Sequence, residues 1–258
     1  MTNIENAARR LFSDWENRTP YAALSGDCLI ETVSDAYAAQ AMLQSLHIPK
    51  RGKIAGRKIA LWSKAMQNMV GMDEPVAGAF FANEVHETGA TIHLSHFIRL
   101  GLEFELALEL GQDVAPSEQI HTEASVVDLV AGVRPAFELI EDRAADYSDL
   151  HALTLVADNA WCGGVVLGPK IEKWRSLDLN DTPAVVFQSD QPQEHTNTGA
   201  ATPLASLAWV LNHFSARGIP LAKGEHVITG SAVRTRFPNA NETLRYEVGT
   251  SAVEIMVV

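Results

Sequence analysis

Three glutamates that alternate with apolar residues are the first groups in this chain whose types and spacing could do chemistry. They lie in LEFELALEL, residues 102–110. Successive side chains of a strand point to opposite faces, so Glu103 and Glu105 would share one face while Phe104 and the leucines face a core. An ordinary half-solvated strand gives the same pattern. Glu109 fits that ordinary interpretation better, because it would lie about 20 Å from Glu103.

A fourth glutamate, Glu138, stands in the run VRPAFELI, where apolar residues flank it on both faces of a predicted strand. A buried carboxylate is costly unless it is protonated, paired with a cation or bound to a metal. An ion pair with Arg134 or Arg143 is one solution. Three carboxylates around one ion are the other, and an all-oxygen ligand set with open positions suits Mg²⁺ or Mn²⁺ and not zinc.

The composition argues against several classes of protein. No stretch approaches the roughly 18 apolar residues of a membrane span. The 20 basic residues are outnumbered by 32 acidic ones and do not cluster, which disfavours a nucleic-acid partner. The first residues mix charged and apolar side chains and lack the apolar core of a signal peptide. We therefore expect a cytoplasmic protein without a membrane partner, in which Cys28 and Cys162 are free thiols.

Hydrophobic periodicity divides the chain into helices and strands. The helical pattern predicts helices at 4–17, 31–47, 122–130 and 203–217. Alternating or short apolar runs predict strands at 58–63, 91–97, 102–110, 134–141, 152–157, 163–167, 183–188, 225–229 and 244–257. Glycines and prolines predict a loop at 69–84, and 184–201 is expected to form a hairpin or a mobile flap. We expect a single α+β domain at 1–258, mixed and β-rich, with a helical N-terminal arm at 1–50 and a β-rich catalytic region at 51–258.

Seven stretches, in this order and spacing, resemble one family of enzymes. They are DAYAAQ (35–40), GRKIALWS (56–63), VGMDEP (70–75) followed by Gly78, LEFELAL (102–108), PAFELIEDR (135–143), LVADNAWCGG (155–164) and RGIPLAKGEHVITG (217–230). The family is the 2-keto-4-pentenoate hydratase and 4-oxalocrotonate decarboxylase group, whose members have the fumarylacetoacetate hydrolase-like fold. The resemblance covers nearly the whole chain, and it implies a closed homo-oligomer.

The resemblance also implies a metal site beside an active-site cation. Glu103, Glu105 and Glu138 match the ligands of a divalent metal, Mg²⁺ or Mn²⁺, and Lys58 matches the cation. Substrates of the family are 2-oxo acids or their enols, which chelate a metal through a carboxylate oxygen and the 2-oxo oxygen. The metal would stabilise the developing enolate, and Lys58 would donate a hydrogen bond or move a proton. From the residues alone, Lys58 would more readily be a surface lysine at the start of a strand.

Departures from the family pattern bear on the reaction. The enolate can add water at the distal double bond or lose CO₂. Hydratases of the group carry an aspartate where this chain has Val76, and this tilts the expectation slightly toward decarboxylation of a 4-oxalocrotonate-like substrate. Thr202 replaces the histidine of a GHPL motif, and Trp62 and Trp161 replace small residues. We expect Trp62, Val76 and Trp161 at the substrate, in a pocket shaped for a smaller, flatter or more apolar molecule.

Some residues and functions stay open at this point. Asp158 and Asn159 match supporting or substrate-contacting residues by resemblance, but a plain turn is an equal interpretation. Hydration, acylpyruvate cleavage by metal-bound water, and a non-catalytic ligand-binding role are the alternatives, the last because the usual aspartate and histidine are missing. His93 and His96 would face opposite sides of a predicted strand, which argues against a shared metal.

Overall fold

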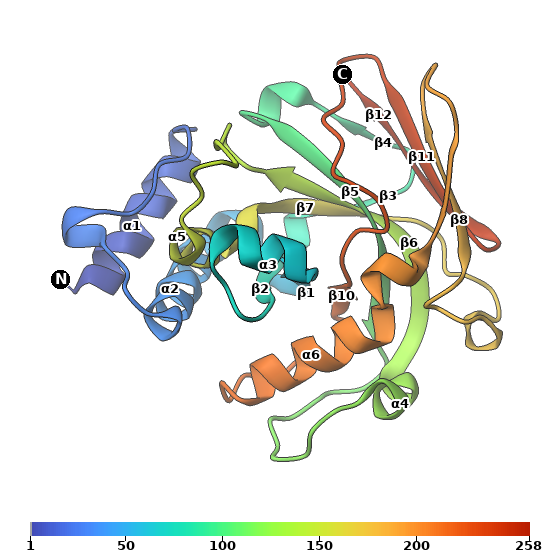
Figure 1. Cartoon of the computed structure of the whole chain (residues 1–258), viewed down its shortest axis with the longest axis horizontal. Helices are drawn as coiled ribbons and strands as arrows, with labels where there is room; N and C mark the ends of the chain where they lie inside the picture. Colours follow the sequence, from blue (N-terminus) through green and yellow to red (C-terminus); the bar gives the residue numbers. More distant parts are fainter. Residues whose placement is uncertain (1) are drawn as a thin grey trace.

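Two β-sheets form the body of the protein, with one group of helices at the left of Figure 1 and a second group at the bottom. The computed structural model describes residues 2–258. The larger sheet has the strand order β2-β1-β10-β5-β6-β7-β3. Its strands are β1 (Ile54–Ala60), β2 (Val76–Phe81), β3 (Val85–Glu87), β5 (Leu100–Leu110), β6 (Val130–Glu141), β7 (Cys162–Leu167) and β10 (His226–Ile228). The smaller sheet, in the order β4-β12-β11-β8-β9, consists of β4 (Ala90–Ile92), β8 (Pro183–Gln188), β9 (Glu194–Asn197), β11 (Thr243–Val248) and β12 (Ser251–Val257).

The larger core lies where the two sheets meet. The ring of Phe104 on β5 meets Phe137 of β6 and Tyr246 of β11 edge to face, with centroid separations of 5.2 and 5.7 Å. Aromatic pairs of this geometry stabilise a core beyond the area that they bury. Because Phe104 and the leucines of β5 point into this core, the glutamates that alternate with them point to the other face of the sheet.

The N-terminal helices build a second core with a short helix from the middle of the chain. α1 (Asn3–Glu16) begins with a capping box between Thr2 and Glu5. It packs on α2 (Val33–Arg51), which packs in turn on α5 (Ala152–Ala157), and α3 (Lys64–Val70) lies nearby (Figure 1). Away from this group, α6 (Pro203–Ser215) packs on α4 (Glu123–Val126). No helix among residues 2–258 combines the length and the apolar character that crossing a membrane requires.

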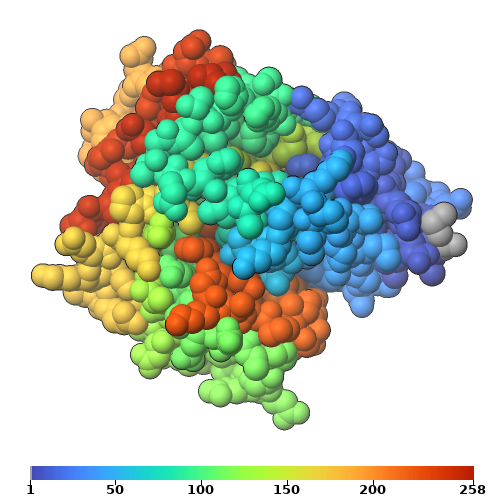
Figure 2. Space-filling model, turned by 180° about the vertical axis from the view of Figure 1, so that it is seen from behind, coloured from blue at the N-terminus to red at the C-terminus, as the bar shows by residue number. Residues whose placement is uncertain are grey.

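The N-terminal helices also touch the segment that follows β2. In the view from behind, the blue N-terminal part of the chain lies next to the blue-green segment around residues 80–100 (Figure 2). Arg51, the last residue of α2, pairs there with Glu84. A cavity lies between these two parts of the chain.

Most of the predicted elements are confirmed, and the differences have local causes. Residues 152–157 form helix α5 and not a strand, because a six-residue apolar run does not distinguish the two. Residues 69–84, predicted as a loop, contain the whole of β2. Residues 91–97 leave the strand conformation after Ile92 and enter a 3₁₀ turn at Leu94–His96. The segment 184–201 contains the β8–β9 hairpin, and both cysteines are free thiols as expected.

Candidate metal centre and active site

Three glutamates from two neighbouring strands converge at one point on the larger sheet. In the antiparallel pair β5–β6, Glu103 lies directly opposite Glu138, and Glu105 follows on the same face of β5. One carboxylate oxygen from each residue lies within 4.8 Å of the corresponding oxygens of the other two. Among residues 2–258, no other group of three or more His, Cys, Asp or Glu side chains converges in this way.

The oxygen atoms of this cluster fit a hard divalent cation. The backbone N–H of Gly230 donates to Glu105 Oε2 at 2.7 Å, and the hydroxyl of Thr235 donates to Glu103 Oε1 at 2.7 Å. Buried Oε1 of Glu105 and Oε2 of Glu138 accept no hydrogen bond from any described residue. Bare buried carboxylate oxygens are costly, and an all-oxygen set of this kind is what Mg²⁺ or Mn²⁺ prefers.

The cluster carries more negative charge than its surroundings neutralise. Burial raises the pKa of Glu105 well above its ordinary value, and the carboxylates of Glu138 and Glu103 raise it further. Burial raises the pKa of Glu138 to about 7, although the charge of Lys58 acts in the opposite direction. A bound dication would oppose these shifts and favour three ionised carboxylates. Acids perturbed in this way are typical of functional sites.

Lys58 brings a positive charge to the cluster from the neighbouring strand β1. Its side chain is 1% exposed, its Nζ lies 2.9 Å from Glu138 Oε1, and it donates a hydrogen bond of 3.1 Å to the carbonyl of Ala160. Burial alone would lower the pKa of Lys58, but Glu138, followed by Cys162 and Glu103, outweighs burial and raises that pKa above its ordinary value. Without a metal, Lys58 is therefore a charged hydrogen-bond donor.

The ion pair between Lys58 and Glu138 replaces the pairs considered from the sequence. Arg134 lies 3.3 Å from Glu87 on the surface, and Arg143 pairs with Asp158. Neither arginine reaches Glu138, because both are committed elsewhere.

A left-handed turn presents the carbonyl of Ala160 to Lys58. Asn159, Ala160 and Trp161 have φ angles of 56°, 49° and 60°. Residues with a Cβ adopt this conformation at a cost of roughly 1–2 kcal/mol each. The turn packs closely on β2, where a Cβ at Gly78 would lie 2.6 Å from the Asn159 carbonyl oxygen and 3.2 Å from Cδ of Lys58. Glycine at position 78 permits this approach.

The side chains of Asp158 and Asn159 hold this turn in place through contacts with other parts of the protein. The Asn159 side chain exchanges two hydrogen bonds with the backbone of Ala79, at 2.7 and 2.8 Å. Asp158 is fully buried, accepts from the Trp15 indole at 2.7 Å and pairs with Arg143. Burial raises the pKa of Asp158 to about 6, against the effect of Arg143. Both side chains contact protein and lie outside the lining of the cavity that holds Lys58.

That cavity has a volume of about 1060 Å³, and both Lys58 and Glu103 line it. The indoles of Trp62 and Trp161 line it as well, as expected from the sequence. Val76 does not, because β2 points this fully buried side chain into the N-terminal core. The structure thus brings two of the five residues expected at the substrate to the cavity lining, and Val76, Asp158 and Asn159 lie outside it. Its other apolar lining includes Leu61, Met66, Ile140, Leu150 and Leu155.

Residues 230–236 form a wall of the cavity that reasoning from the sequence missed. This segment runs beside β5, with hydrogen bonds from Ala232 N to Phe104 O at 2.8 Å and from Arg236 N to Leu102 O at 2.9 Å. It supplies the two donors to the glutamates described above, and Arg234 also lines the cavity. The available signal was its position, directly after the family-like stretch that ends at Gly230.

Glu109, on the same strand as the metal cluster, stays outside it. Its carboxylate lies 2.7 Å from the ammonium group of Lys170 and pairs with that surface lysine. The ordinary strand-face interpretation is therefore confirmed for Glu109.

Comparison with solved structures identifies the fold. The 4-oxalocrotonate decarboxylase from Pseudomonas putida G7, complexed with magnesium and adipate, has a TM-score of 0.90 to this structure at 20% identity, covering 99% of this chain and 97% of that one. A fumarylacetoacetate hydrolase family protein from Yersinia pestis CO92 has a TM-score of 0.59 at 15% identity, covering 81% of this chain and 95% of its own. The protein therefore has the fumarylacetoacetate hydrolase-like fold.

Comparison with curated sequences narrows this class to one family. A 2-keto-4-pentenoate hydratase from Paraburkholderia xenovorans (strain LB400) is 34% identical over 230 residues, which is 88% of this chain and 84% of the relative. A 2-oxo-hept-4-ene-1,7-dioate hydratase from Escherichia coli is 29% identical and covers 94% of this chain and 92% of its own. No family model matches the chain. The chain belongs to the 2-keto-4-pentenoate hydratase and 4-oxalocrotonate decarboxylase group, a group of lyases.

Proposed function

We propose that this protein is a divalent-metal-dependent lyase acting on a 2-oxo acid or its dienol. The observation that carries the proposal is the convergence of Glu103, Glu105 and Glu138, the last two with bare buried oxygens, beside a cavity that Lys58 and Glu103 line. Mg²⁺ or Mn²⁺ bound there would supply Lewis-acid stabilisation of the negative charge on the substrate's 2-oxo oxygen. The names of the curated relatives support the same class of substrate.

The ammonium group of Lys58 would donate a hydrogen bond to the oxygen on which the negative charge develops. Two contacts hold its ammonium group, the Glu138 carboxylate and the Ala160 carbonyl. An ammonium group has three donors, so one is left for a substrate oxygen. Because the group is buried and already oriented, it stabilises that charge without reorganisation during the reaction.

The apolar part of the cavity supports a flat, conjugated substrate. Trp62 and Trp161 line it together with aliphatic side chains such as Ile140 and Leu155. Apolar walls of this kind exclude bulk water from a reacting centre and strengthen the electrostatic interactions within it.

Addition of water to the distal double bond is the reaction that we favour. The curated relative with 34% identity is named a hydratase. Arg234 lines the cavity, and no hydrogen bond or ion pair joins its side chain to the rest of residues 2–258. It is suited to a second carboxylate that remains in the product, such as that in the name of the Escherichia coli relative. On a departing carboxylate the same arginine would stabilise the reactant and slow the reaction.

Decarboxylation of a 4-oxalocrotonate-like acid is the second candidate. Within residues 2–258, no aspartate or histidine lines the cavity, and its two carboxylates are Glu103 of the metal cluster and Glu194, which pairs with Arg236. Loss of CO₂ needs no group that activates water, so this lining is compatible with it. Val76 gives this candidate less support than the sequence indicated, because its side chain lies in the core.

Product analysis tests the proposal and separates the two candidates. The protein is incubated with Mg²⁺ and, in turn, with 2-hydroxypenta-2,4-dienoate, with the dienol of 2-oxo-hept-4-ene-1,7-dioate, and with 4-oxalocrotonate. We expect a hydrated 2-oxo acid from the first two substrates, with turnover abolished by EDTA and restored by Mg²⁺. Release of CO₂ from 4-oxalocrotonate alone would establish decarboxylation instead. Turnover of none of the three, with Mg²⁺ still bound, would support a non-catalytic protein, and cleavage of an acylpyruvate would support a hydrolase.

A further inference from the structure

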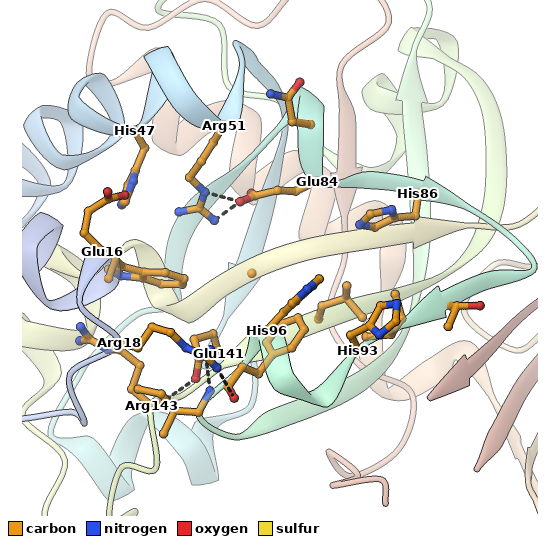
Figure 3. A pocket seen from close by; sticks show the side chains of 18 residues that line it. Glu16, Arg18, His47, Arg51, Glu84, His86, His93, His96, Glu141 and Arg143 are labelled. Carbon is orange, nitrogen blue, oxygen red and sulfur yellow. Dashed lines mark hydrogen bonds and ion pairs between the residues drawn. The ribbon is translucent and has the colours of Figure 1, made fainter. Parts of the chain in front are cut away.

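A second cavity, of about 440 Å³, lies on the other side of β6 from the metal centre. Figure 3 shows it between the N-terminal helices and the segment from β3 to the 3₁₀ turn at Leu94–His96. Side chains of β6 alternate between the two cavities: Ile140 lines the one with the metal cluster, whereas Leu139 and Glu141 line this one. We call it the rear cavity.

The carboxylates of the rear cavity are already used as acceptors within the protein. Both oxygens of Glu84 accept from the guanidinium of Arg51. Glu141 accepts from the backbone N–H groups of Ile98 and Arg143, at 2.7 and 2.9 Å. Glu16 pairs with a lysine outside the cavity. The negative charges that line the cavity are therefore neutralised or hydrogen-bonded without a ligand.

Several hydrogen-bond donors of the rear cavity, by contrast, have no acceptor within residues 2–258. Buried Nη1 of Arg51 and buried Nε of Arg143 make no hydrogen bond within residues 2–258, and Nη1 of Arg143 lies 4.0 Å from a carboxylate oxygen of Asp14. His47 is 2% exposed, and neither of its ring nitrogens has a partner among these residues. Burial, together with the nearby Arg51 and Lys50, lowers the pKa of His47 to about 3, so its ring is neutral and carries one N–H donor.

The rim of the rear cavity adds further donors. The imidazoles of His86, His93 and His96 and the guanidinium of Arg18 line it (Figure 3). The rings of His93 and His96 lie 5.2 Å apart, so the prediction that they face opposite sides is wrong. The chain turns at Leu94–His96 and brings both rings to the same cavity.

We propose that the rear cavity is a binding site for a small oxyanion, a carboxylate or a phosphate-like group, held by Arg51, Arg143 and His47. Buried donors without partners are rare in folded proteins and are ordinarily satisfied by a ligand or by water. Three residues with such groups, Arg51, Arg143 and His47, line this one cavity, and two of the three are cationic. The ligand that completes their hydrogen bonds is an anion with several acceptor oxygens.

The contacts of these residues determine which of them can be tested. Arg143 pairs with Asp158, which anchors the turn that holds Lys58. A change at Arg143 would therefore disturb the catalytic machinery. His47 lies instead among the rings of Phe12, Trp15 and Phe81. His47→Phe keeps the size and the aromatic surroundings of this side chain and removes its hydrogen bond.

Sulfate is a suitable probe, because it is a tetrahedral oxyanion and a weak ligand of Mg²⁺. Calorimetric titration of the magnesium-loaded protein with sulfate, against chloride at the same ionic strength, is expected to give one saturable site per chain in the millimolar range. The same titration with acetate tests whether the site binds a carboxylate. His47→Phe and the paired change Arg51→Met with Glu84→Gln should each weaken binding about tenfold or more. His47→Gln, which restores a donor, should recover part of the affinity.

A control variant and a folding check make the result decisive. His195→Phe, a change of the same type at an exposed position on β9, should leave sulfate binding unchanged. Circular dichroism and Mg²⁺ binding show whether each variant is folded. Equal sulfate affinity in the wild type, in His47→Phe and in the Arg51 and Glu84 pair would overturn the assignment. The absence of saturable binding of both anions to the wild type would also overturn it.

Discussion

The indole nitrogen of Trp62 donates a hydrogen bond of 2.9 Å to the hydroxyl of Thr202. Both positions depart from the pattern of the family, where a small residue and a histidine are expected. The two departures therefore form one contact: the larger side chain at 62 is accompanied by a smaller one at 202. Since Trp62 lines the cavity with Lys58, this contact fixes part of the cavity wall.

A double-mutant cycle should show that the effects of substitutions at Trp62 and Thr202 on activity depend on each other. Thr202→His alone brings a larger side chain against the indole, and Trp62→Ser alone leaves a void, so each is expected to lower kcat/KM. The pair Trp62→Ser with Thr202→His should recover activity, with an interaction energy of about 1–3 kcal/mol. Steady-state kinetics on the best substrate measures this. Losses that simply add would mean that the two positions act independently.

Removal of one metal ligand should abolish metal binding without unfolding the protein. Glu105→Gln keeps the size of the side chain and removes a carboxylate that has a bare buried oxygen. We expect Mg²⁺ affinity and turnover to fall by more than about 100-fold, because even partners outside the ligand set contribute 10–100-fold. In EDTA the variant should melt no lower than the wild type, since burial and the neighbouring carboxylates disfavour the charged form of Glu105.

The matched control for Glu105→Gln is Glu109→Gln. It lies on the same strand, but its partner is Lys170 on the surface. Mg²⁺ titration by calorimetry should give the wild-type affinity for this variant. A comparable loss of Mg²⁺ affinity in both variants would mean that the substitutions act by disturbing strand β5 and not by removing a metal ligand.

Lys58→Met should separate metal binding from catalysis. The change removes the positive charge beside Glu138, which repels a dication, so at a pH where the carboxylates are ionised Mg²⁺ should bind at least as tightly as in the wild type. Turnover should fall by about 10²–10⁴-fold, the usual contribution of a positioned donor or acid. Calorimetry and kinetics on the same preparation give both values. Loss of metal binding would show that Lys58 has a structural role.

Metal affinity should depend on pH through Glu138. Burial raises its pKa to about 7 in the metal-free protein. Below pH 7 the folded, metal-free protein carries a proton on this carboxyl group, and the metal must displace it. The dissociation constant should therefore rise by about tenfold for each pH unit below 7. Calorimetry in two buffers of different ionisation enthalpy counts the released protons, and a constant affinity from pH 6 to 8 would contradict the assignment.

Arg234 should discriminate between substrates with one and two carboxylates. Its side chain lines the cavity and is not engaged by any other described residue. We expect Arg234→Gln to raise KM for the dicarboxylate 2-oxo-hept-4-ene-1,7-dioate about tenfold and to leave 2-hydroxypenta-2,4-dienoate unaffected, since a charged hydrogen bond contributes about 1.5–3 kcal/mol. Arg245→Gln, on the exposed side of β11, is the control. An equal change in KM for both substrates would show that Arg234 does not bind the second carboxylate.

The sequence predicted the strands of the metal cluster well, because their alternation is long and regular. Residues 102–110 and 134–141 lie in β5 and β6, and Glu103 and Glu105 share a face as the period of two requires. The register that sets Glu103 opposite Glu138 is a pairing between distant segments, which local periodicity does not contain. The family resemblance, and not the spacing, brought Glu138 into the expected cluster.

The features that sequence reasoning missed depend on backbone turns. The left-handed turn at Asn159 and Ala160 carries no glycine, so nothing in its composition indicated that its carbonyl faces Lys58. The turn at Leu94–His96 likewise interrupted an apolar run that resembled a strand. The wall at 230–236 owes its place to hydrogen bonds with β5 and not to its own pattern.

The register of β5 against β6 would couple binding of the proposed metal to correct pairing of the two strands. Because side chains alternate along a strand, a slip of one residue would carry Glu138 to the opposite face, away from Glu103. The observed register brings the three glutamates together, so a bound ion would stabilise it over a register slipped by one residue. Magnesium supply in the cell would then influence the yield of native protein as well as its turnover.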